Sequence, residues 1–384
     1  MAARQPRKAQ ARAKPVSVAF LGAGNVLGAY LQALDRLIPT GEAALAGVQA
    51  RNPKRRADLA RQRPGVRLFG GTDEALACDA DVIVIITPPA SHAALGRAAL
   101  LRGKHVLVEK PLALDCRDAR ALAALAQRRG LHLVAAPFVH LAPTFRFLYS
   151  LIASGSIGPV HSARGLYGNA GSHWAAWYFG KEGGPLADLG IYNIKSLTTL
   201  LGPVASVYHQ AANSARIRAV AGRRIRKPEP DVAHTLLIHR SGAISSIVAS
   251  HAICAYERPG LELYGSIGTA YLRGDDWDPR GVDVWRESTG SWESFAPIEP
   301  TWLWTDGLID LVRSLRASRL PQSDLAQDLH LIDVLAAAEI SRHRRAPVTV
   351  RATWQAPARP RMRMESLRHS LRPLHDHTRP AGEQ

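Results

Sequence analysis

Short apolar runs alternate with stretches of helical periodicity through the first third of the chain. The run DVIVIITPP at 81–89 is almost continuous and rich in β-branched residues, which is typical of a parallel strand buried on both faces. In VLGAYLQALDRL, at 26–37, apolar residues instead recur every three or four positions, as on one side of a helix. Strands and helices in alternation predict an α/β fold, a doubly wound parallel sheet of the Rossmann type over residues 15–137.

The pattern changes after residue 138. A helix is predicted first, and then come pairs of alternating runs joined by glycine turns, as in TLLIHRSGAISSIVAS, LELYGSIGTAYLRG and VDVWRESTGSWESF. Such pairs are typical of antiparallel hairpins. A helical stretch at 305–342 follows. Residues 138–350 therefore predict an α+β domain built on an open, mainly antiparallel sheet, which would carry substrate binding and oligomerisation.

Length and composition agree with two globular domains. The chain has 384 residues, of which 46% are hydrophobic, and this is enough to bury two cores. Its three cysteines have neither an even count nor metal-site spacing, which favours a reducing compartment. No apolar run has the roughly 18 residues needed to cross a bilayer. We expect a cytoplasmic protein without a membrane partner.

The formal net charge of +17 is concentrated in part at the two ends of the chain. Residues 1–14 contain arginines and lysines but no acid, and we interpret them as a disordered basic leader. Residues 351–384 form a second basic tail, also expected to be unfolded. Such tails can bind nucleic acid through phosphates, but no nucleic-acid-binding module is recognisable, so solubilising tails are the favoured interpretation.

The segment GAGNVLG, at 22–28, approximates a dinucleotide-binding fingerprint. It follows a predicted strand and opens a predicted helix, although its third glycine arrives one place late. Gly22 would allow the tight turn and Gly24 the close approach of a pyrophosphate to the backbone. The alternative is that these glycines serve only the turn. The expected cofactor contacts here are Gly22, Gly24, Asn25 and Val26.

The end of the second predicted strand bears on the choice of cofactor. An acidic residue there would bind the ribose hydroxyls of NAD, but this chain has Ala50 followed by Arg51 and Asn52. A guanidinium group favours the 2′-phosphate of NADP. The sequence therefore predicts NADP, with NAD less favoured, and Arg51 and Asn52 as contacts. The alternative is that 51–56 is a solvated helix start.

Four blocks of sequence resemble the Gfo/Idh/MocA oxidoreductase family over residues 15–350: GAGNVLGAYL, ITPPASHAALGRAALLRGKHVLVEKPLAL, GGPLADLGIYNIKSLTTLLGPV and LELYGSIGTAYL. The resemblance implies an NAD(P)-dependent dehydrogenase or reductase of sugars, cyclitols or related alicyclic compounds. It also implies a homodimer or homotetramer that pairs through the open sheet face. A second interpretation stays open: a catalytically silent NAD(P)-binding sensor or scaffold whose basic tails contact a partner.

The resemblance also implies roles for individual residues. Lys110, in Glu-Lys-Pro, would lie beside the nicotinamide and the substrate hydroxyl, and Pro111 would follow a cis peptide. A lysine has a pKa near 10.4 in water, so it needs burial or nearby positive charge to act as a base at neutral pH. The further cofactor contacts implied are Thr87, Pro88, His92 and Glu109.

The segment DLGIYN, at 188–193, would complete the proton-handling group. The commoner family pattern has a histidine where this chain has Tyr192, and some branches use a tyrosine there as the acid. Asp188 and Tyr192 are one helical turn apart and can face one pocket. We expect Lys110 and Tyr192 to handle the proton, with the ammonium lowering the pKa of the phenol, and Asp188 to orient them. The alternative is a helix cap and a core tyrosine.

Two further sets of residues are candidates. His173, Trp174 and Trp177 precede the DLGIYN segment and could form a wall on which a sugar ring stacks, with Tyr192 also binding substrate, although aromatic residues in a loop also serve cores and interfaces. His369, His375 and His377 lie in the basic tail, where solvated side chains are favoured over a metal site. No metal is expected.

Overall fold

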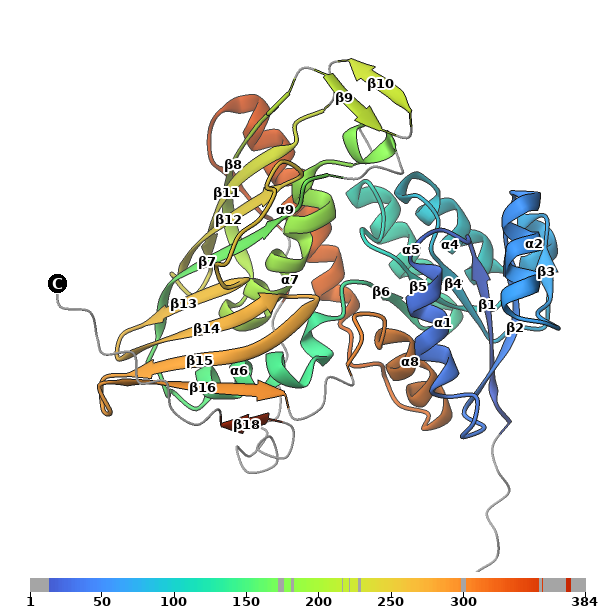
Figure 1. The fold of residues 1–384 in the computed structure, drawn as a ribbon, viewed down its shortest axis with the longest axis horizontal. Coiled ribbons are helices and arrows are strands. Elements are labelled where there is room, and N and C mark those ends of the chain that lie inside the picture. Colours follow the sequence, from blue (N-terminus) through green and yellow to red (C-terminus); the bar gives the residue numbers. More distant parts are fainter. Residues whose placement is uncertain are drawn as a thin grey trace, which may run out of the picture.

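The computed structural model describes residues 14–171, 176–180, 183–215, 217–220, 222–226, 229–297, 302–351, 354 and 371–373. These residues form two halves, each built on one large sheet (Figure 1). Within them, no helix is both long enough and apolar enough to cross a membrane. Residues 1–13 of the predicted basic leader and most of the C-terminal tail lie outside the described residues.

The first half contains a six-stranded parallel sheet in the order β3-β2-β1-β4-β5-β6. This is the doubly wound order of dinucleotide-binding domains, as the alternating pattern predicted. The ligand crevice of such a sheet lies outside the carboxyl ends of its strands. The strands are β1 Val16–Leu21, β2 Ala43–Gln49, β3 Leu68–Phe69, β4 Val82–Ile85, β5 His105–Val108 and β6 Leu133–Ala135.

Helices cover both faces of this sheet (Figure 1). They are α1 Leu27–Asp35, α2 Pro53–Gln62, α3 Thr72–Leu76, α4 His92–Leu101 and α5 Cys116–Arg129, with the short turn η1 Pro89–Ser91. A further helix, α8 Gly307–Arg316, comes from far along the chain and packs beside α1. Its buried residues Leu308 and Leu311 share one apolar core with Phe20 and Leu34. The first half is therefore completed by a late segment of the chain.

The second half contains a ten-stranded sheet in the order β17-β8-β11-β12-β7-β13-β14-β15-β16-β18. Among the strand pairs of the described residues only β7–β12 is parallel, so the predicted open, mainly antiparallel sheet is confirmed. The strands are β7 Val160–Gly168, β8 Val204–Ala212, β11 Val232–His239, β12 Ile244–Ser250, β13 Leu261–Gly265, β14 Gly268–Asp275, β15 Asp278–Arg286, β16 Ser291–Pro297, β17 Val348–Thr349 and β18 Leu371–Pro373. A separate hairpin joins β9 Ile217–Val220 and β10 Arg223–Arg226.

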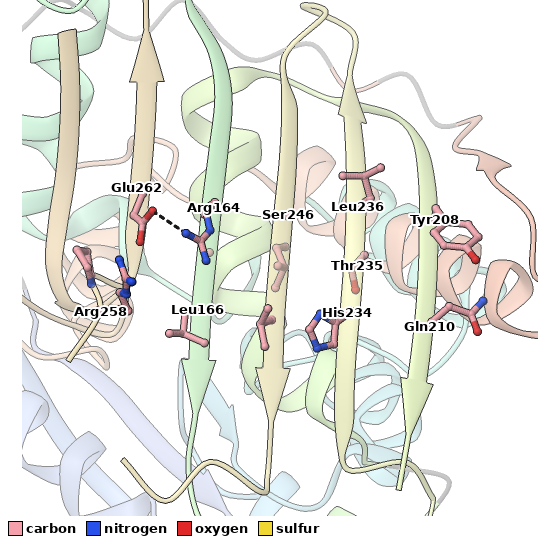
Figure 2. A pocket seen from close by; sticks show the side chains of 14 residues that line it. Arg164, Leu166, Tyr208, Gln210, His234, Thr235, Leu236, Ser246, Arg258 and Glu262 are labelled. Carbon is pink, nitrogen blue, oxygen red and sulfur yellow. Dashed lines mark hydrogen bonds and ion pairs between the residues drawn. The ribbon is translucent and has the colours of Figure 1, made fainter. Parts of the chain in front are cut away.

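Helices cover the face of the large sheet that looks toward the first half (Figure 1). They are α6 Pro143–Ala153, α7 Ile191–Leu201 and α9 Leu325–Arg344, with the short turns η2 Val139–Leu141, η3 Ala176–Phe179 and η4 Leu186–Gly190. The other face is bare in the described part of the chain. It holds a hollow of about 400 Å³ lined by side chains of neighbouring strands, among them the ion-paired Arg164 and Glu262 (Figure 2).

Two expectations from the sequence need correction. The helical stretch predicted at 305–342 is two helices: α8 packs in the first half, and α9 packs between β8 of the large sheet and α5 of the first half. The C-terminal tail is not uniformly unfolded, because β18 pairs with β16 and Trp354 is buried. The indole Nε1 of Trp354 donates to Asp324 at 2.7 Å, which satisfies the polar end of a buried ring.

A buried ion pair joins α7 to α9. Lys195 and Asp328 have side chains exposed by 0% and 2%, and the Lys195 Nζ lies 2.6 Å from the Asp328 Oδ1. Burial raises the pKa of Asp328 above its usual value, while the Lys195 charge acts against that rise. Either charge alone would be destabilising in this buried position. The oppositely charged partner replaces the stabilisation that water gives to an exposed charge.

We predict that Lys195→Met lowers the free energy of unfolding by about 3–5 kcal/mol, since it leaves the Asp328 carboxylate buried without its cation. The double variant Lys195→Met/Asp328→Leu should recover most of that loss, because both charges are removed together. Urea denaturation followed by tryptophan fluorescence measures both. Equal stability of the single variant and the wild type would contradict the assignment.

Candidate active site

The glycine turn after β1 leaves room for a ligand. Gly22 has a φ of +105°, and a Cβ there would lie 2.9 Å from the Ile86 carbonyl oxygen, so a side chain is excluded on two grounds. A Cβ on Gly24 would meet nothing within 4 Å. In the described structure, the N-cap of α1, Val26, makes no side-chain cap hydrogen bond. The open turn and the helix N-terminus fit a pyrophosphate.

The basic segment after β2 is partly used by the fold. Asn52 caps α2, with its Oδ1 accepting from the Lys54 N–H at 2.9 Å. The Arg55 Nε donates to the Ala23 carbonyl at 2.9 Å, which ties α2 to the glycine turn. An Arg56 guanidinium nitrogen lies 2.6 Å from the Ala50 carbonyl. Arg51, directly after the strand, is exposed.

The turn after β4 forms the next part of the cavity wall. Thr87 and Pro88 line the cavity, as the resemblance implied for a turn that passes the cofactor. His92 instead lies fully buried behind the turn, with its Nδ1 2.8 Å from the Pro111 carbonyl and its Nε2 2.8 Å from the Thr87 carbonyl. Burial lowers the pKa of His92. The histidine thus ties the turn to the Glu-Lys-Pro segment.

Glu109 is held in place at the end of β5. It is only 7% exposed, and its Oε1 accepts from the Tyr30 hydroxyl at 2.8 Å. Its Oε2 accepts from the backbone N–H of Lys110 at 3.0 Å. The Lys110–Pro111 peptide bond is cis, in agreement with the resemblance. Tyr30 was missed as a site residue because the sequence shows it only as one of the apolar positions of α1.

Lys110 reaches across to the second half of the molecule. Its Nζ donates to the backbone carbonyl of Asp188 at 2.7 Å and also to the Asp188 Oδ1. Both side chains are largely buried. Asp188 lies in η4, a π-helical turn that runs into α7, and such turns are frequent at functional sites. The widened turn presents its carbonyl and carboxylate to one ammonium group.

Tyr192, near the start of α7, lies beside this ion pair. The Lys110 Nζ is 5.4 Å from the centre of the phenol ring, and Tyr192 is 9% exposed. The pKa of Tyr192 lies well above its usual value, first because of burial and then because of the Glu109 carboxylate. The expectation that the nearby ammonium lowers this pKa was wrong, because burial and the carboxylates outweigh it. The phenol is protonated at neutral pH.

One cavity of about 570 Å³ joins these groups. It runs from the glycine turn to the Lys110–Asp188 pair and Tyr192. The sequence did not single out several of its other lining residues: Tyr167, Asn169, Tyr178, His251, Trp277 and Trp304. Tyr167 contacts Tyr192 edge to face at 5.9 Å and stacks on Trp277 at 6.4 Å. The predicted wall residues His173 and Trp174, and the side chain of Trp177, lie outside the described part of the chain.

Comparison with known families assigns both halves of the chain. Residues 16–136 match a family model described as oxidoreductase family, NAD-binding Rossmann fold, and residues 145–271 match the GFO/IDH/MocA C-terminal domain. The chain belongs to the GFO/IDH/MocA family of oxidoreductases. As a member of that family it is an NAD(P)-dependent dehydrogenase that acts on CH–OH groups.

Curated relatives of this GFO/IDH/MocA protein include two mammalian dehydrogenases. Trans-1,2-dihydrobenzene-1,2-diol dehydrogenase of Oryctolagus cuniculus is 31% identical over 270 residues, which cover 70% of this chain and 78% of the relative. The enzyme of the same name from Bos taurus is 30% identical over 252 residues, covering 65% of this chain and 72% of the relative.

Solved structures of lower identity share the fold. An NAD-binding oxidoreductase from Klebsiella pneumoniae superposes with a TM-score of 0.77 at 23% identity, covering 88% of this chain and 99% of the other. Aldose-aldose oxidoreductase from Caulobacter crescentus, complexed with glycerol, gives a TM-score of 0.75 at 19% identity, covering 88% and 100%. These two likenesses show the GFO/IDH/MocA fold.

Proposed function

We propose that the protein is an NADP-dependent dehydrogenase of an alicyclic diol, a cyclitol or a sugar, with Lys110 and Tyr192 handling the proton and Asp188 orienting them. The observation that carries the proposal is the convergence of an ammonium, a carboxylate and a phenol in one cavity that begins at a glycine turn. A protein that only binds the nucleotide would not need these three proton-transfer groups around one cavity.

The chemistry needs two transfers from one carbinol. The carbon gives up a hydride, which the nicotinamide accepts when bound, and the oxygen gives up a proton. Lys110 and Tyr192 both line the cavity, so a hydroxyl oxygen on a substrate ring bound there can reach either of them. Because Tyr192 is protonated at neutral pH, it can donate a hydrogen bond to a ketone oxygen as negative charge develops there. Glu109, which accepts a hydrogen bond from Tyr30, would help to hold the cofactor in the cavity.

The aromatic lining supports a ring-shaped substrate. Tyr167, Tyr178 and Trp277 line the same cavity as Lys110 and Tyr192. Flat aromatic faces offer a large apolar contact to an unsaturated or saturated ring, while the polar groups of the same cavity can bind its hydroxyls. The curated relatives named trans-1,2-dihydrobenzene-1,2-diol dehydrogenase point to vicinal diols of this shape as the first compounds to try.

Proton handling is tested by Lys110→Met and Tyr192→Phe, assayed with NADP and a panel of cyclic trans-diols, cyclitols and aldoses. We expect kcat to fall roughly 10²- to 10⁴-fold in each variant, the range in which general acid–base groups contribute. Formation of reduced nicotinamide follows the reaction, and NADPH fluorescence titration checks that the cofactor still binds. Tyr271→Phe, on strand β14, is the matched control. Unchanged kcat in both site variants would contradict the roles proposed for Lys110 and Tyr192.

The preference for NADP rests on the end of β2. Ala50 leaves no carboxylate to repel a 2′-phosphate, and the Arg56 guanidinium is already engaged with the Ala50 carbonyl. The exposed Arg51 follows the strand directly, where the adenosine ribose is bound in this type of sheet. A guanidinium can hold a phosphate through two parallel hydrogen bonds. These features support Arg51 as the group that selects NADP.

We expect Arg51→Ala to weaken NADPH binding by roughly 10- to 100-fold, the worth of a charge-assisted hydrogen bond, while NADH binding changes little. Fluorescence titration with each nucleotide measures the two constants separately. Arg61→Ala, which removes an arginine paired with Asp58 further along α2, is the control. Equal losses for NADPH and NADH in Arg51→Ala would argue against recognition of the 2′-phosphate.

We also propose that the bare face of the large sheet binds a second copy of the chain. Tyr208, Leu236 and Ile244 are exposed by 38%, 40% and 45%, and Tyr208 and Leu236 lie on adjacent strands facing outward (Figure 2). Contiguous exposed apolar side chains on one sheet face are typical of an interaction surface. The oppositely charged Arg164 and Glu262 on the same face can pair again across a two-fold axis.

Leu236→Arg should convert the oligomer to a monomer, because it places a charge at the centre of an apolar contact. Light scattering during size-exclusion chromatography measures the mass. Leu320→Arg, at a residue that is 79% exposed after α8, is the control and should leave the mass unchanged. A wild-type protein that runs as a monomer would contradict this proposal without affecting the catalytic one.

A further inference from the structure

His251 lies against the carboxylate that holds the lysine. It follows the last residue of β12 and is 1% exposed, and its backbone N–H donates to the Asp231 carbonyl at 2.8 Å. Its Nε2 is 3.6 Å from the Asp188 Oδ2, while Lys110 binds the other carboxylate oxygen. The Lys110 ammonium and the His251 imidazole thus approach opposite oxygens of one carboxylate.

The second ring nitrogen of His251 also meets an acceptor. Its Nδ1 lies 3.3 Å from the Asn169 Oδ1. The orientation of that amide is set independently, because the same Oδ1 accepts from the Gly171 N–H at 2.9 Å. An imidazole with an oxygen acceptor near each nitrogen can donate to both only when it carries two protons. The 3.6 Å between Nε2 and the Asp188 Oδ2 is an ion-pair separation that is longer than a hydrogen bond.

Aromatic packing holds the ring in this position. Tyr178 and Phe179, both in η3, contact His251 edge to face at 5.9 and 5.8 Å. These contacts keep the imidazole plane directed between Asn169 and Asp188. The ring also lines the cavity that contains Lys110.

We propose that His251 is a positioning residue that acts as a second cation on Asp188. The inference rests on the function proposed above, in which Lys110 takes up a proton during alcohol oxidation. A carboxylate shared between two cations holds each of them less firmly than one it serves alone. His251 thereby weakens the hold of Asp188 on Lys110, so that the lysine can accept the substrate proton, while Asp188 keeps its place. The substrate O–H proton goes to the lysine, and no bond to His251 forms or breaks.

Other titratable groups line the same cavity or bind its lining. They are Glu109 after β5, Tyr30 from α1, Tyr167 from β7, Tyr178 from η3 and Tyr192 from α7, while the nearby Asp231 carboxylate binds Ser214. Tyr192 has a pKa well above its usual value, and the pKa of Tyr167 is also raised, chiefly by burial. A shift seen in a His251 variant near neutral pH is therefore not the titration of these phenols.

The test uses His251→Gln and His251→Phe in the full-length protein with NADP and an alcohol substrate. Glutamine keeps an N–H donor near Asp188 but removes the charge, and phenylalanine keeps only the packing against η3. We expect the acidic limb of the kcat profile to move to higher pH by roughly one unit in both variants. At neutral pH we expect kcat to fall roughly 10-fold in both. A shift of about one pH unit lowers the fraction of enzyme in the active protonation state about tenfold on this limb of the profile. The fall should be larger in His251→Phe.

Controls separate this inference from the function on which it rests. NADPH binding should be unchanged in both variants, and His161→Gln, at an exposed histidine of β7, should leave the profile as in the wild type. A lower kcat with an unmoved limb would show that the ring only packs, and would overturn the proposal. If Lys110→Met retains full activity, the proposed function fails first. If Lys110→Met is inactive but the His251 variants match the wild type, the proposed role of His251 is refuted and the proposed function is not.

Discussion

The ion pair between Lys110 and Asp188 joins the two halves of the molecule at the place where chemistry occurs. Lys110 belongs to the end of a parallel strand in the first half, and Asp188 belongs to the π-helical turn that leads into α7 in the second. Neither side chain would be stable at this depth alone, since an unpaired buried charge costs several kcal/mol. The pairing therefore constrains how the two halves meet. It also places a proton donor and its counter-ion at the floor of the cavity.

The rest of the site is arranged around that constraint. Glu109 is held by Tyr30 from α1, and His92 ties the turn after β4 to Pro111, so the segment that bears the lysine is fixed from two sides. Tyr192 is one turn beyond Asp188 on the same helical segment, so fixing the carboxylate also fixes the phenol. Precision of this kind matters because proton transfer requires hydrogen-bond geometry.

The sequence was informative wherever the signal was local. The β-branched run of β4 and the glycine turn after β1 are dictated by neighbouring residues, and both were predicted at the right positions. Contacts between segments far apart in the sequence could not be predicted in this way. Nothing in the chain near Tyr30 reveals that its hydroxyl meets Glu109, and His251 reaches Asp188 only because the strand order puts the end of β12 beside η4. The packing of α8 against α1 is of the same kind, since an amphipathic pattern states which face is buried but not against what.

The protonation of the site follows from competition between burial and charge. Burial keeps the proton on Tyr192, and the nearby carboxylates act in the same direction. Asp188 is ion-paired with Lys110, and in the proposed mechanism a second cation on that carboxylate weakens this pairing. The same groups serve oxidation and reduction, because a reversible reaction passes through one transition state in both directions. The site therefore sets how fast the proton moves, while the ratio of oxidised to reduced nucleotide sets which way the reaction runs.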